Sequence, residues 1–253
     1  MIRVEVIEMN FHNKVALITG AAVGIGRATA LGMAERGADL VLLDMNEEGL
    51  EALAAELSRF PVRVFCARCD VSREDEVNAV VARAIGELGK IDILVNNAGI
   101  WRCRASFLDV SVEEWQLYLN VNVMGTVYVT RAVLPGMLER SYGRIINVAS
   151  VAGVYGNAKM SHYSATKGAL ISMTRALAKE VSDKGVTVNA VSPGSVSPSR
   201  ELDVDYTQPS ELSFIGRTGS GRENADLICF LASDEASYIS GQNIQIDGCR
   251  KKQ

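Results

Sequence analysis

The chain has 253 residues, of which 48% are hydrophobic and 22% charged, and its formal net charge is −4. A chain of this length can bury enough apolar surface to fold without disulfides or metal ions, and its negative charge argues against nucleic acids or anionic membranes as partners. Charged residues at positions 3, 5 and 8 and the lack of a long apolar stretch argue against a signal peptide or a membrane span, so we expect a cytoplasmic protein.

The cysteines are scattered and odd in number, which does not suit a disulfide framework. Cys66 and Cys69 form a C-x-x-C at the end of a strand-like run, 62–67, whereas a reactive thiol of this kind usually opens a helix. No second pair follows to complete a zinc site. We therefore expect no metal and ordinary reduced thiols, with a redox-active pair as the alternative. The thiols are those of Cys66, Cys69, Cys103, Cys229 and Cys249.

Short apolar runs rich in β-branched residues are typical of parallel strands that lie between two layers of helices. Such runs cover residues 15–19, 40–44, 62–67, 91–95, 144–148, 186–191 and 243–246. Longer segments with helical periodicity alternate with them. These segments cover residues 24–36, 46–57, 72–88 and 161–181, and another begins at Ser111. Gly37 fits a helix C-cap, and Ser72 and Ser111 fit N-caps with an acidic residue three positions later.

This alternation predicts right-handed βαβ crossovers and an α/β fold of the doubly wound Rossmann type with a parallel sheet. We expect residues 13–253 to form a single domain, preceded by an N-terminal extension of residues 1–12. The stretch 195–221 breaks the alternation with Pro198, Pro209 and several Ser and Gly residues. Long irregular loops in compact domains are usually functional, so we expect a lid there.

A glycine-rich turn, Thr19 to Gly26, joins the first expected strand to the first expected helix. Glycine lets the backbone approach a pyrophosphate closely, and the helix N-terminus offers free N–H groups to it. The spacing is G-x-x-x-G-x-G, and a turn that uses glycine for steric reasons alone is the alternative. The position at the first strand–helix junction favours a dinucleotide site.

Asp44 ends the second expected strand, ~20 residues after the glycines, where a carboxylate accepts hydrogen bonds from the adenosine ribose. It would repel a 2′-phosphate and therefore predicts NAD over NADP; the alternative is a cap for the next helix. Asp70, after the third strand, suits a helix cap or an adenine contact. Residues 96–99 follow the fourth strand and either line the same crevice or form a simple turn.

Tyr163 and Lys167 are four residues apart, so a phenol and an ammonium group share one helix face. An adjacent cation lowers a tyrosine pKa by favouring phenolate, and a positively charged nicotinamide would lower it further. This predicts a group that takes a proton from an alcohol, and an ordinary surface pair is the alternative. Ser150 ends the fifth expected strand and could hold the substrate oxygen beside Tyr163, which favours the catalytic interpretation.

Asn122 lies within a helical stretch, where asparagine is unfavourable unless its side chain has a function. We expect it to disrupt the helix locally and to hold a water molecule that leads to Lys167.

The chain resembles the short-chain dehydrogenases/reductases over residues 12–249. The shared motifs are T-G-x-x-x-G-I-G at 19–26, N-N-A-G at 96–99, Ser150 thirteen residues before Y-x-x-x-K at 163–167, and Pro193-Gly194. The resemblance implies a seven-stranded parallel sheet flanked by helices and a homotetramer. It also implies hydride transfer to or from nicotinamide, with Lys167 on the nicotinamide ribose. The implied catalytic residues are Asn122, Ser150, Tyr163 and Lys167.

Together with the residues above, the resemblance predicts a set of NAD contacts. They are Gly20, Gly24, Ile25, Gly26, Asp44, Asp70, Val71, Asn97, Ala98, Gly99, Tyr163, Lys167, Pro193, Gly194 and Val196. Pro198 replaces a family threonine that contacts the nicotinamide amide, a role open to Ser197 or Ser199. The usual D-G-G reads Asp247-Gly248-Cys249, and the basic tail 250–252 is either solvated or packed at a subunit interface or near a neighbour's site.

These features predict an NAD-dependent oxidoreductase that interconverts a secondary alcohol and a ketone. One alternative is a non-catalytic NAD-binding regulator of the same fold, which the retained catalytic set argues against. Another is a carbonyl reductase that works mainly in the reductive direction. A serine hydrolase is excluded, because the chain lacks G-x-S-x-G and its only histidines are His12 and His162.

The expected substrate is a polyol, a sugar or a cyclic alcohol. Aromatic side chains could cover a ring, and Asn157 and His162 could bind additional hydroxyls. Arg102 and Arg104 are either surface charges or attract an anionic substrate. We expect residues 199–215 to close over the site. The expected lining residues are Trp101, Ala152, Tyr155, Asn157, His162 and Ser195.

Overall fold

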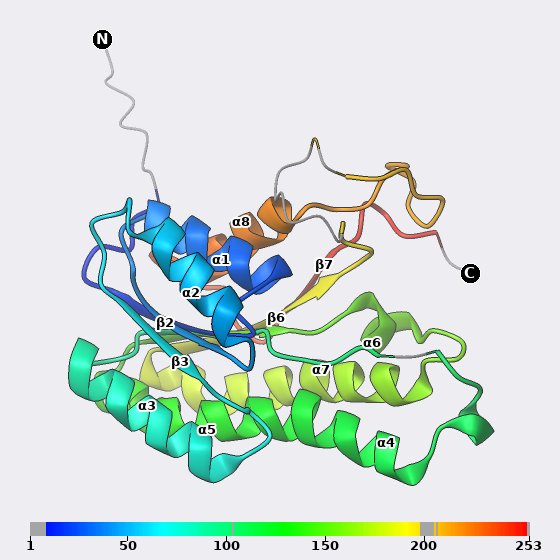
Figure 1. The fold of residues 1–253 in the computed structure, drawn as a ribbon, viewed down its shortest axis with the longest axis horizontal. Helices are drawn as coiled ribbons and strands as arrows, with labels where there is room; N and C mark the ends of the chain where they lie inside the picture. The colour runs from blue at the N-terminus through cyan, green and yellow to red at the C-terminus, as the bar shows by residue number, and fades with distance from the viewer. Residues whose placement is uncertain (1–8, 103, 198–204, 206, 252–253) are drawn as a thin grey trace.

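The computed structural model describes residues 9–102, 104–197, 205 and 207–251. Seven strands form one parallel sheet in the order β3-β2-β1-β4-β5-β6-β7 (Figure 1). The expected doubly wound α/β fold is therefore confirmed. The strands are β1 (Val15–Thr19), β2 (Asp39–Asp44), β3 (Val64–Arg68), β4 (Ile93–Asn96), β5 (Gly143–Val148), β6 (Val186–Pro193) and β7 (Asn243–Ile246).

Helices cover both faces of the sheet (Figure 1). On one face lie α1 (Gly24–Glu35), α2 (Glu47–Leu57) and α8 (Gly221–Ala232). On the other lie α3 (Glu74–Leu88), α4 (Val112–Tyr118), α5 (Gly125–Glu139) and α7 (Ser161–Val181), while the short α6 (Val151–Tyr155) follows β5. None of the helices in the described part of the chain is long and apolar enough to cross a membrane.

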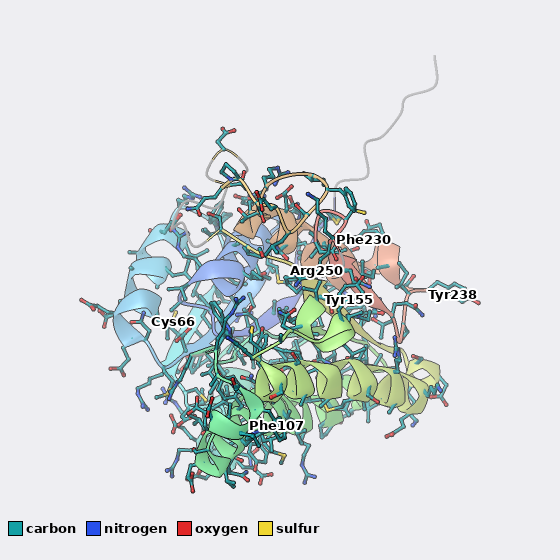
Figure 2. The ribbon with its side chains drawn as sticks, turned by 90° about the vertical axis from the view of Figure 1, so that its right-hand side faces the viewer. Cys66, Phe107, Tyr155, Phe230, Tyr238 and Arg250 are labelled. Atoms are coloured by element: carbon teal, nitrogen blue, oxygen red, sulfur yellow. The ribbon has the colours of Figure 1, made fainter. Side chains whose placement is uncertain are left out.

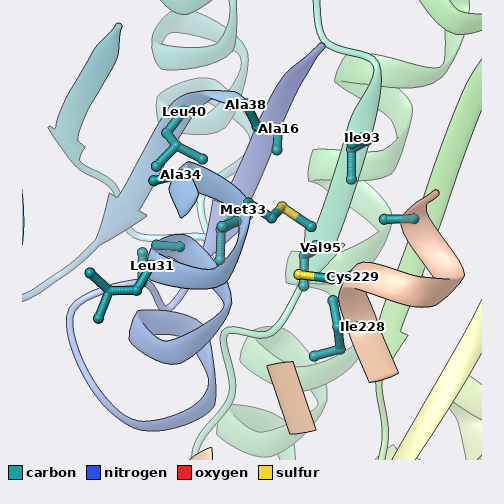
Figure 3. Close-up of a cluster of buried hydrophobic side chains, with 14 of the residues drawn as sticks. Ala16, Leu31, Met33, Ala34, Ala38, Leu40, Ile93, Val95, Ile228 and Cys229 are labelled. Carbon is teal, nitrogen blue, oxygen red and sulfur yellow. The ribbon is translucent and has the colours of Figure 1, made fainter. Parts of the chain in front are cut away.

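Two apolar cores hold the helices against the sheet. Figure 3 shows the first, where Met33 of α1 and Cys229 of α8 meet Val95 of β4, all fully buried. The second lies on the opposite face, where Val77 of α3 and Val133 of α5 pack on the sheet. Strands that are apolar on both faces are a direct consequence of this double covering. The sheet is thereby a rigid platform for residues at its carboxyl edge.

Most element bounds agree with the sequence expectations to within two residues. The N-cap of α3 differs from the expectation, because the helix begins at Glu74 after Arg73, which makes no side-chain cap hydrogen bond. The expected Ser72 cap is wrong, because the Ser72 hydroxyl instead donates to the Asp70 carboxylate over 2.7 Å. Ser111 does cap α4, since its hydroxyl accepts a 3.2 Å hydrogen bond from the Glu114 N–H. Helices α5, α6 and α8 were not among the expected segments.

The sheet order places the functional edge. The chain runs outward from β1 to β3 and then crosses back to β4, so β1 lies between β2 and β4. In open α/β sheets a crevice forms at such a switch point, outside the carboxyl ends of the strands. The turn after β1 and the segment after β4 therefore face the same space.

Candidate active site

The segments that follow β1 and β4 are fastened to each other by hydrogen bonds. The Thr19 hydroxyl accepts from the N–H groups of Asn97 and Ala98, at 3.1 and 3.0 Å. The Asn97 amide donates to the carbonyls of Thr19 and Gly20, at 3.0 and 2.8 Å. These side chains fix the glycine-rich turn against the end of β4, so the two walls of the crevice are held at a set spacing.

The glycines of the turn have separate structural reasons. Gly20 and Gly24 adopt φ values of +63° and +57°, which disfavour a side chain. A Cβ at Gly26 would lie 2.1 Å from the Gly20 carbonyl oxygen, so only glycine fits there. Val23, the N-cap of α1, makes no side-chain cap hydrogen bond. The first N–H groups of α1 are thus available to an anion such as a pyrophosphate.

Asp44 connects the end of β2 to the glycine-rich turn. One carboxylate oxygen accepts from the Ala22 N–H over 2.9 Å, and the other accepts from the Asn46 N–H over 3.0 Å. The α2 cap is Asn46, whose side chain accepts from the Gly49 N–H. Each carboxylate oxygen has lone pairs beyond those used by these bonds, so Asp44 can accept from a ribose as well.

Arg27 is a basic side chain near the expected ribose position that the sequence interpretation did not consider. It lines a cavity between α1 and α2 together with Ala22, Asn46 and Ser197. Its guanidinium makes an ion pair and hydrogen bond with Glu56. Because this carboxylate neutralises it, Arg27 offers little net attraction to a 2′-phosphate.

Asp70 and Val71 follow β3 at the edge of the crevice. The Asp70 carboxylate accepts from both the N–H and the hydroxyl of Ser72, at 3.0 and 2.7 Å. Val71 is buried, and its side chain packs closely on Gly125 of α5. A Cβ added at Gly125 would lie 2.8 Å from a methyl carbon of Val71. The structure thus gives both residues local roles, and their contact with an adenine stays a prediction.

A cavity of about 210 Å³, the catalytic cavity, gathers residues that are far apart in the sequence. Ser150, Tyr163 and Lys167 line it beside Ile25 of the glycine-rich turn. The wall combines apolar side chains with a few convergent polar groups, as small-molecule sites do. The remaining lining residues are Asn97, Gly99, Ile100, Trp101, Val148, Ala149, Pro193, Gly194 and Val196.

The polar side chains of this cavity are held by the ends of β5 and α7. The Ser150 hydroxyl caps α6 by accepting from the Ala152 N–H over 3.1 Å. The Lys167 ammonium donates to the Val148 carbonyl over 2.8 Å and lies 5.8 Å from the centre of the Tyr163 ring. One helical turn of α7 therefore brings the phenol and the ammonium to the same wall.

Burial controls the protonation of both groups. It raises the pKa of Tyr163 above its usual value, against a lowering by the hydrogen bond with Ser150. It lowers the pKa of Lys167 to about 8. The direction for Tyr163 is opposite to that expected from its spacing to Lys167, because desolvation of the phenolate outweighs the favourable interactions. Tyr163 therefore carries its proton at neutral pH.

Asn122 lies in a π-helical turn, Leu119–Met124, between α4 and α5, so the expected local disruption of the helix is confirmed. Its amide oxygen accepts from the Ile100 N–H over 2.7 Å. Its amide nitrogen donates to the Ile100 carbonyl and to the Thr166 hydroxyl, at 3.2 and 3.1 Å. The fully buried side chain thus joins the segment after β4 to α7, next to Lys167. Its water-holding role stays a prediction.

The comparisons with known proteins agree with this geometry. The family model described as short chain dehydrogenase matches residues 14–206. The 3-oxoacyl-[acyl-carrier-protein] reductase of Thermotoga maritima is 42% identical over 95% of this chain and 98% of its own. A (2S)-[(R)-hydroxy(phenyl)methyl]succinyl-CoA dehydrogenase subunit of Thauera aromatica is 39% identical over 96% and 98%. The chain belongs to the short-chain dehydrogenase family.

A solved structure of an NAD⁺-bound xylitol dehydrogenase also matches this short-chain dehydrogenase. Its sequence is 35% identical, and the TM-score is 0.87 over 94% of this chain and 99% of the other. The relatives therefore include proteins named for reduction of a ketone and for oxidation of an alcohol. Membership in the family makes the chain an oxidoreductase, and the substrate has to come from its own residues.

A second cavity, the substrate cavity, measures about 330 Å³ and adjoins the catalytic one. The two cavities share Trp101, Ser150, Tyr163, Gly194 and Val196. Three of the expected substrate residues line it, namely Trp101, Asn157 and Ser195. Arg104, for which attraction of an anionic substrate was one alternative, also lines it, and so do Gly194 and Val196, which were expected as cofactor contacts. The lining residues that were not expected are Val151, Met160 and Arg250.

Three expected substrate residues are not among those that line either cavity. Ala152 is buried in α6. Tyr155 is half exposed, and its hydroxyl donates to the Gln245 side chain over 2.5 Å. His162 is fully buried, with its ring centre 4.3 Å from that of Tyr118. Because α7 turns His162 away from the face that carries Tyr163, its imidazole packs inside the protein.

The expected lid, 195–221, is described only in part. Residues 198–204 and 206 lie outside the described residues. Pro198, which replaces the family threonine, Ser199, which could take over its role, and Lys252 of the basic tail are therefore outside them as well. Ser197 lines the cavity beside α1 and α2. Within the described part, isolated bridges join Val196 to Gly219 and Ser213 to Arg250. The described end of this segment is therefore tied to the C-terminal residues.

The C-x-x-C pair shows no sign of thiolate chemistry. Cys69 is buried, and desolvation raises its pKa to about 12. Burial also raises the pKa of Cys66. Reactive cysteines instead have a lowered pKa, because the thiolate is the nucleophile. Both residues pack with the cores of the protein, as reduced thiols would.

Proposed function

We propose that the protein catalyses the NAD-dependent interconversion of a secondary alcohol and a ketone. The observation that carries the proposal is the catalytic cavity, where Ser150, Tyr163 and Lys167 meet the glycine-rich turn at the carboxyl edge of the sheet. Hydroxyl, phenol and ammonium groups at one wall suit proton transfer at a substrate oxygen. The turn beside them suits a dinucleotide.

The residues present fit a nicotinamide dinucleotide. Gly24 leaves open space where a side chain would stand, and a Cβ at Gly99 would meet both Asn122 and Lys167. The first turn of α1 would hold the pyrophosphate, and Lys167 would hold the nicotinamide ribose. When bound, the nicotinamide accepts or supplies the hydride. NAD is favoured by Asp44, since its carboxylate would repel a 2′-phosphate.

The chain's own residues handle the proton. Ser150 holds the substrate oxygen, and Tyr163 gives its proton to a ketone oxygen or takes one from an alcohol. At neutral pH the buried Tyr163 is protonated, which is the state needed for reduction. For oxidation the phenol has to release that proton, which the Lys167 ammonium and a positively charged nicotinamide would favour.

A second candidate is a carbonyl reductase that works mainly in the reductive direction. It is favoured by relatives named 3-oxoacyl-[acyl-carrier-protein] reductase, at 42% identity in Thermotoga maritima and 35% in Escherichia coli. The two candidates share all the proton chemistry and differ in substrate and direction. The resemblance to the xylitol dehydrogenase instead supports the first candidate with a polyol or a sugar as its substrate.

A substrate screen with purified protein tests the proposal. Secondary alcohols, including polyols, sugars, cyclic alcohols and hydroxysteroids, are assayed with NAD⁺ and with NADP⁺. Ketones, including a 3-oxoacyl thioester, are assayed with NADH and NADPH. The proposal predicts NAD-linked turnover that is higher than NADP-linked turnover for the same substrate. Turnover only with a 3-oxoacyl thioester would favour the second candidate. Cofactor binding without turnover of any compound would favour the non-catalytic regulator.

Assembly and location are part of the same proposal. We expect a cytoplasmic homotetramer that works on a small-molecule alcohol or ketone, with neither nucleic acid nor membrane as a partner. Light scattering of the purified protein gives the number of subunits directly, and a mass of one or two chains would contradict the tetramer.

A further inference from the structure

We infer that the substrate carries an anionic group, a carboxylate or a phosphate, which Arg250 and Arg104 bind in the substrate cavity. The inference rests on the proposed function, since it concerns the compound oxidised or reduced beside Tyr163. It replaces a neutral polyol with an acidic hydroxy or keto compound. The C-terminal segment then contributes to substrate specificity within its own chain. The sequence alternatives placed the tail in solvent, at a subunit interface or near a neighbour's site.

The lining of the substrate cavity is cationic. Arg104 and Arg250 both contribute to it, and none of its lining residues is Asp or Glu. The chain as a whole has a net charge of −4, so a wall with two arginines and no carboxylate is a local exception. A cavity of one sign of charge with low-dielectric walls attracts ligands of the opposite sign.

Arg250 is oriented by a neutral amide at its guanidinium and by a carboxylate at its backbone. Its guanidinium donates to the Asn157 amide oxygen over 3.0 Å, and its backbone N–H donates to the Asp247 carboxylate over 3.3 Å. A bridge to Ser213 fixes the backbone further. Figure 2 shows Arg250 on the same side of the molecule as Tyr155 of α6. The side chain is thereby positioned without losing its charge to a partner.

Neither arginine is neutralised within the described part of the chain. The ion pairs found there, out to 4.0 Å, include neither Arg104 nor Arg250. Arg217, by contrast, also lies near the C-terminal segment and makes a 2.7 Å ion pair with Glu223. The guanidinium of Arg250 has five N–H donors, and one of them donates to Asn157. The rest are available to a ligand.

Arg104 lies on the segment after β4, far from Arg250 in the sequence, and lines the same cavity. The neighbouring Ala105 N–H donates to the Lys159 carbonyl over 3.0 Å, which ties this segment to the start of α7. A planar guanidinium suits bidentate recognition of a carboxylate or phosphate, and two of them suit an anion between them. At about 330 Å³ the cavity is at the small end of ligand sites, so it suits a compact acid.

Matched pairs of compounds and variants test the inference. The pairs are 3-hydroxybutyrate with its methyl ester, and glycerol 3-phosphate with glycerol; each member has a secondary hydroxyl. The variants are Arg250→Gln, Arg250→Lys and Arg104→Gln. Arg175→Gln is the control, because Arg175 is exposed on α7 and lines neither cavity. Binding is followed by tryptophan fluorescence, since Trp101 lines both cavities, and turnover is followed by NADH formation.

We expect the wild-type protein to bind one acid more tightly than its neutral partner. Arg250→Gln should weaken binding of that acid about 10- to 100-fold, as loss of a charge-assisted hydrogen bond does. Arg250→Lys should retain part of the preference, Arg104→Gln should lose part of it, and Arg175→Gln should keep all of it. The pair that responds distinguishes a carboxylate from a phosphate.

Two results would overturn the inference: equal binding of both members of each pair, or equal weakening of acid and neutral partner in Arg250→Gln. NADH formation reports separately on the proposed function. Selective acid binding without turnover would leave the anion site standing and contradict the oxidoreductase proposal for these compounds. Turnover without acid preference would support the oxidoreductase proposal and contradict the anion site.

Discussion

The Lys167 ammonium donates a 2.8 Å hydrogen bond to the main-chain carbonyl of Val148, the last residue of β5. The lysine is thus held on the sheet, with its charge inside the protein and 4% of its surface exposed. A buried cation lacks the solvation that water provides, and this lowers the pKa of Lys167 to about 8. The position is costly for stability and useful for chemistry.

The first prediction concerns this cost. Lys167→Met should stabilise the protein most below pH 8, and the gain should vanish as the pH rises to 10.5. Between these values the unfolded chain binds more protons at residue 167 than the folded one, so wild-type stability rises with pH through this group. The pKa difference corresponds to roughly 3 kcal/mol. Urea unfolding of both proteins at several pH values measures it.

The exposed Lys179, on the same helix, provides the control. Lys179→Met should change the free energy of unfolding little and equally at each pH. A constant difference between Lys167→Met and wild type from pH 7 to 10.5 would show that the buried ammonium has an ordinary pKa.

The second prediction concerns cofactor choice at Asp44. Asp44→Ala should raise the ratio of NADP to NAD binding, because it removes the negative charge that repels a 2′-phosphate. Asp44→Asn is the matched variant, since its amide oxygen can still accept from Ala22 or Asn46. Dissociation constants for both cofactors measure the ratio. An unchanged ratio in both variants would mean that Asp44 only ties the turn to β2.

The third prediction separates two glycines. Gly26→Ala should destabilise the protein by several kcal/mol and abolish cofactor binding, since its Cβ would lie 2.1 Å from the Gly20 oxygen. Gly86→Ala should stabilise it by about 0.5–1 kcal/mol, because Gly86 is an exposed residue inside α3 with open space around its Cβ. Thermal unfolding compares them. A Gly26→Ala protein that melts with wild type would contradict the close packing of the turn.

Sequence periodicity located the sheet well, because parallel strands buried on both faces have to be apolar throughout. It missed α8, although Ser220 and Glu223 form a complete capping box there. The stretch before α8 is irregular and contains proline, so no hydrophobic periodicity leads into this helix. The helix 161–181 was expected with the correct ends, which placed Tyr163 and Lys167 on one face.

The site was less predictable where three-dimensional packing decides. His162 is adjacent to Tyr163, yet a helix turns successive residues ~100° apart, and the imidazole lies against Tyr118. The Tyr163 pKa depends on burial, which spacing does not reveal. Arg250 reaches Asn157 only through the fold of the C-terminal segment. These contacts join residues that no local pattern connects.

The central claim is that Tyr163 transfers the proton at the substrate oxygen, and Tyr163→Phe tests it most directly. Tyr155→Phe is the control, because Tyr155 lies outside both cavities. With any substrate found in the screen, Tyr163→Phe should bind NAD like the wild type and lose about 100- to 10,000-fold in turnover. Tyr155→Phe should keep its rate. A Tyr163→Phe enzyme with a near-normal rate would contradict the assigned mechanism.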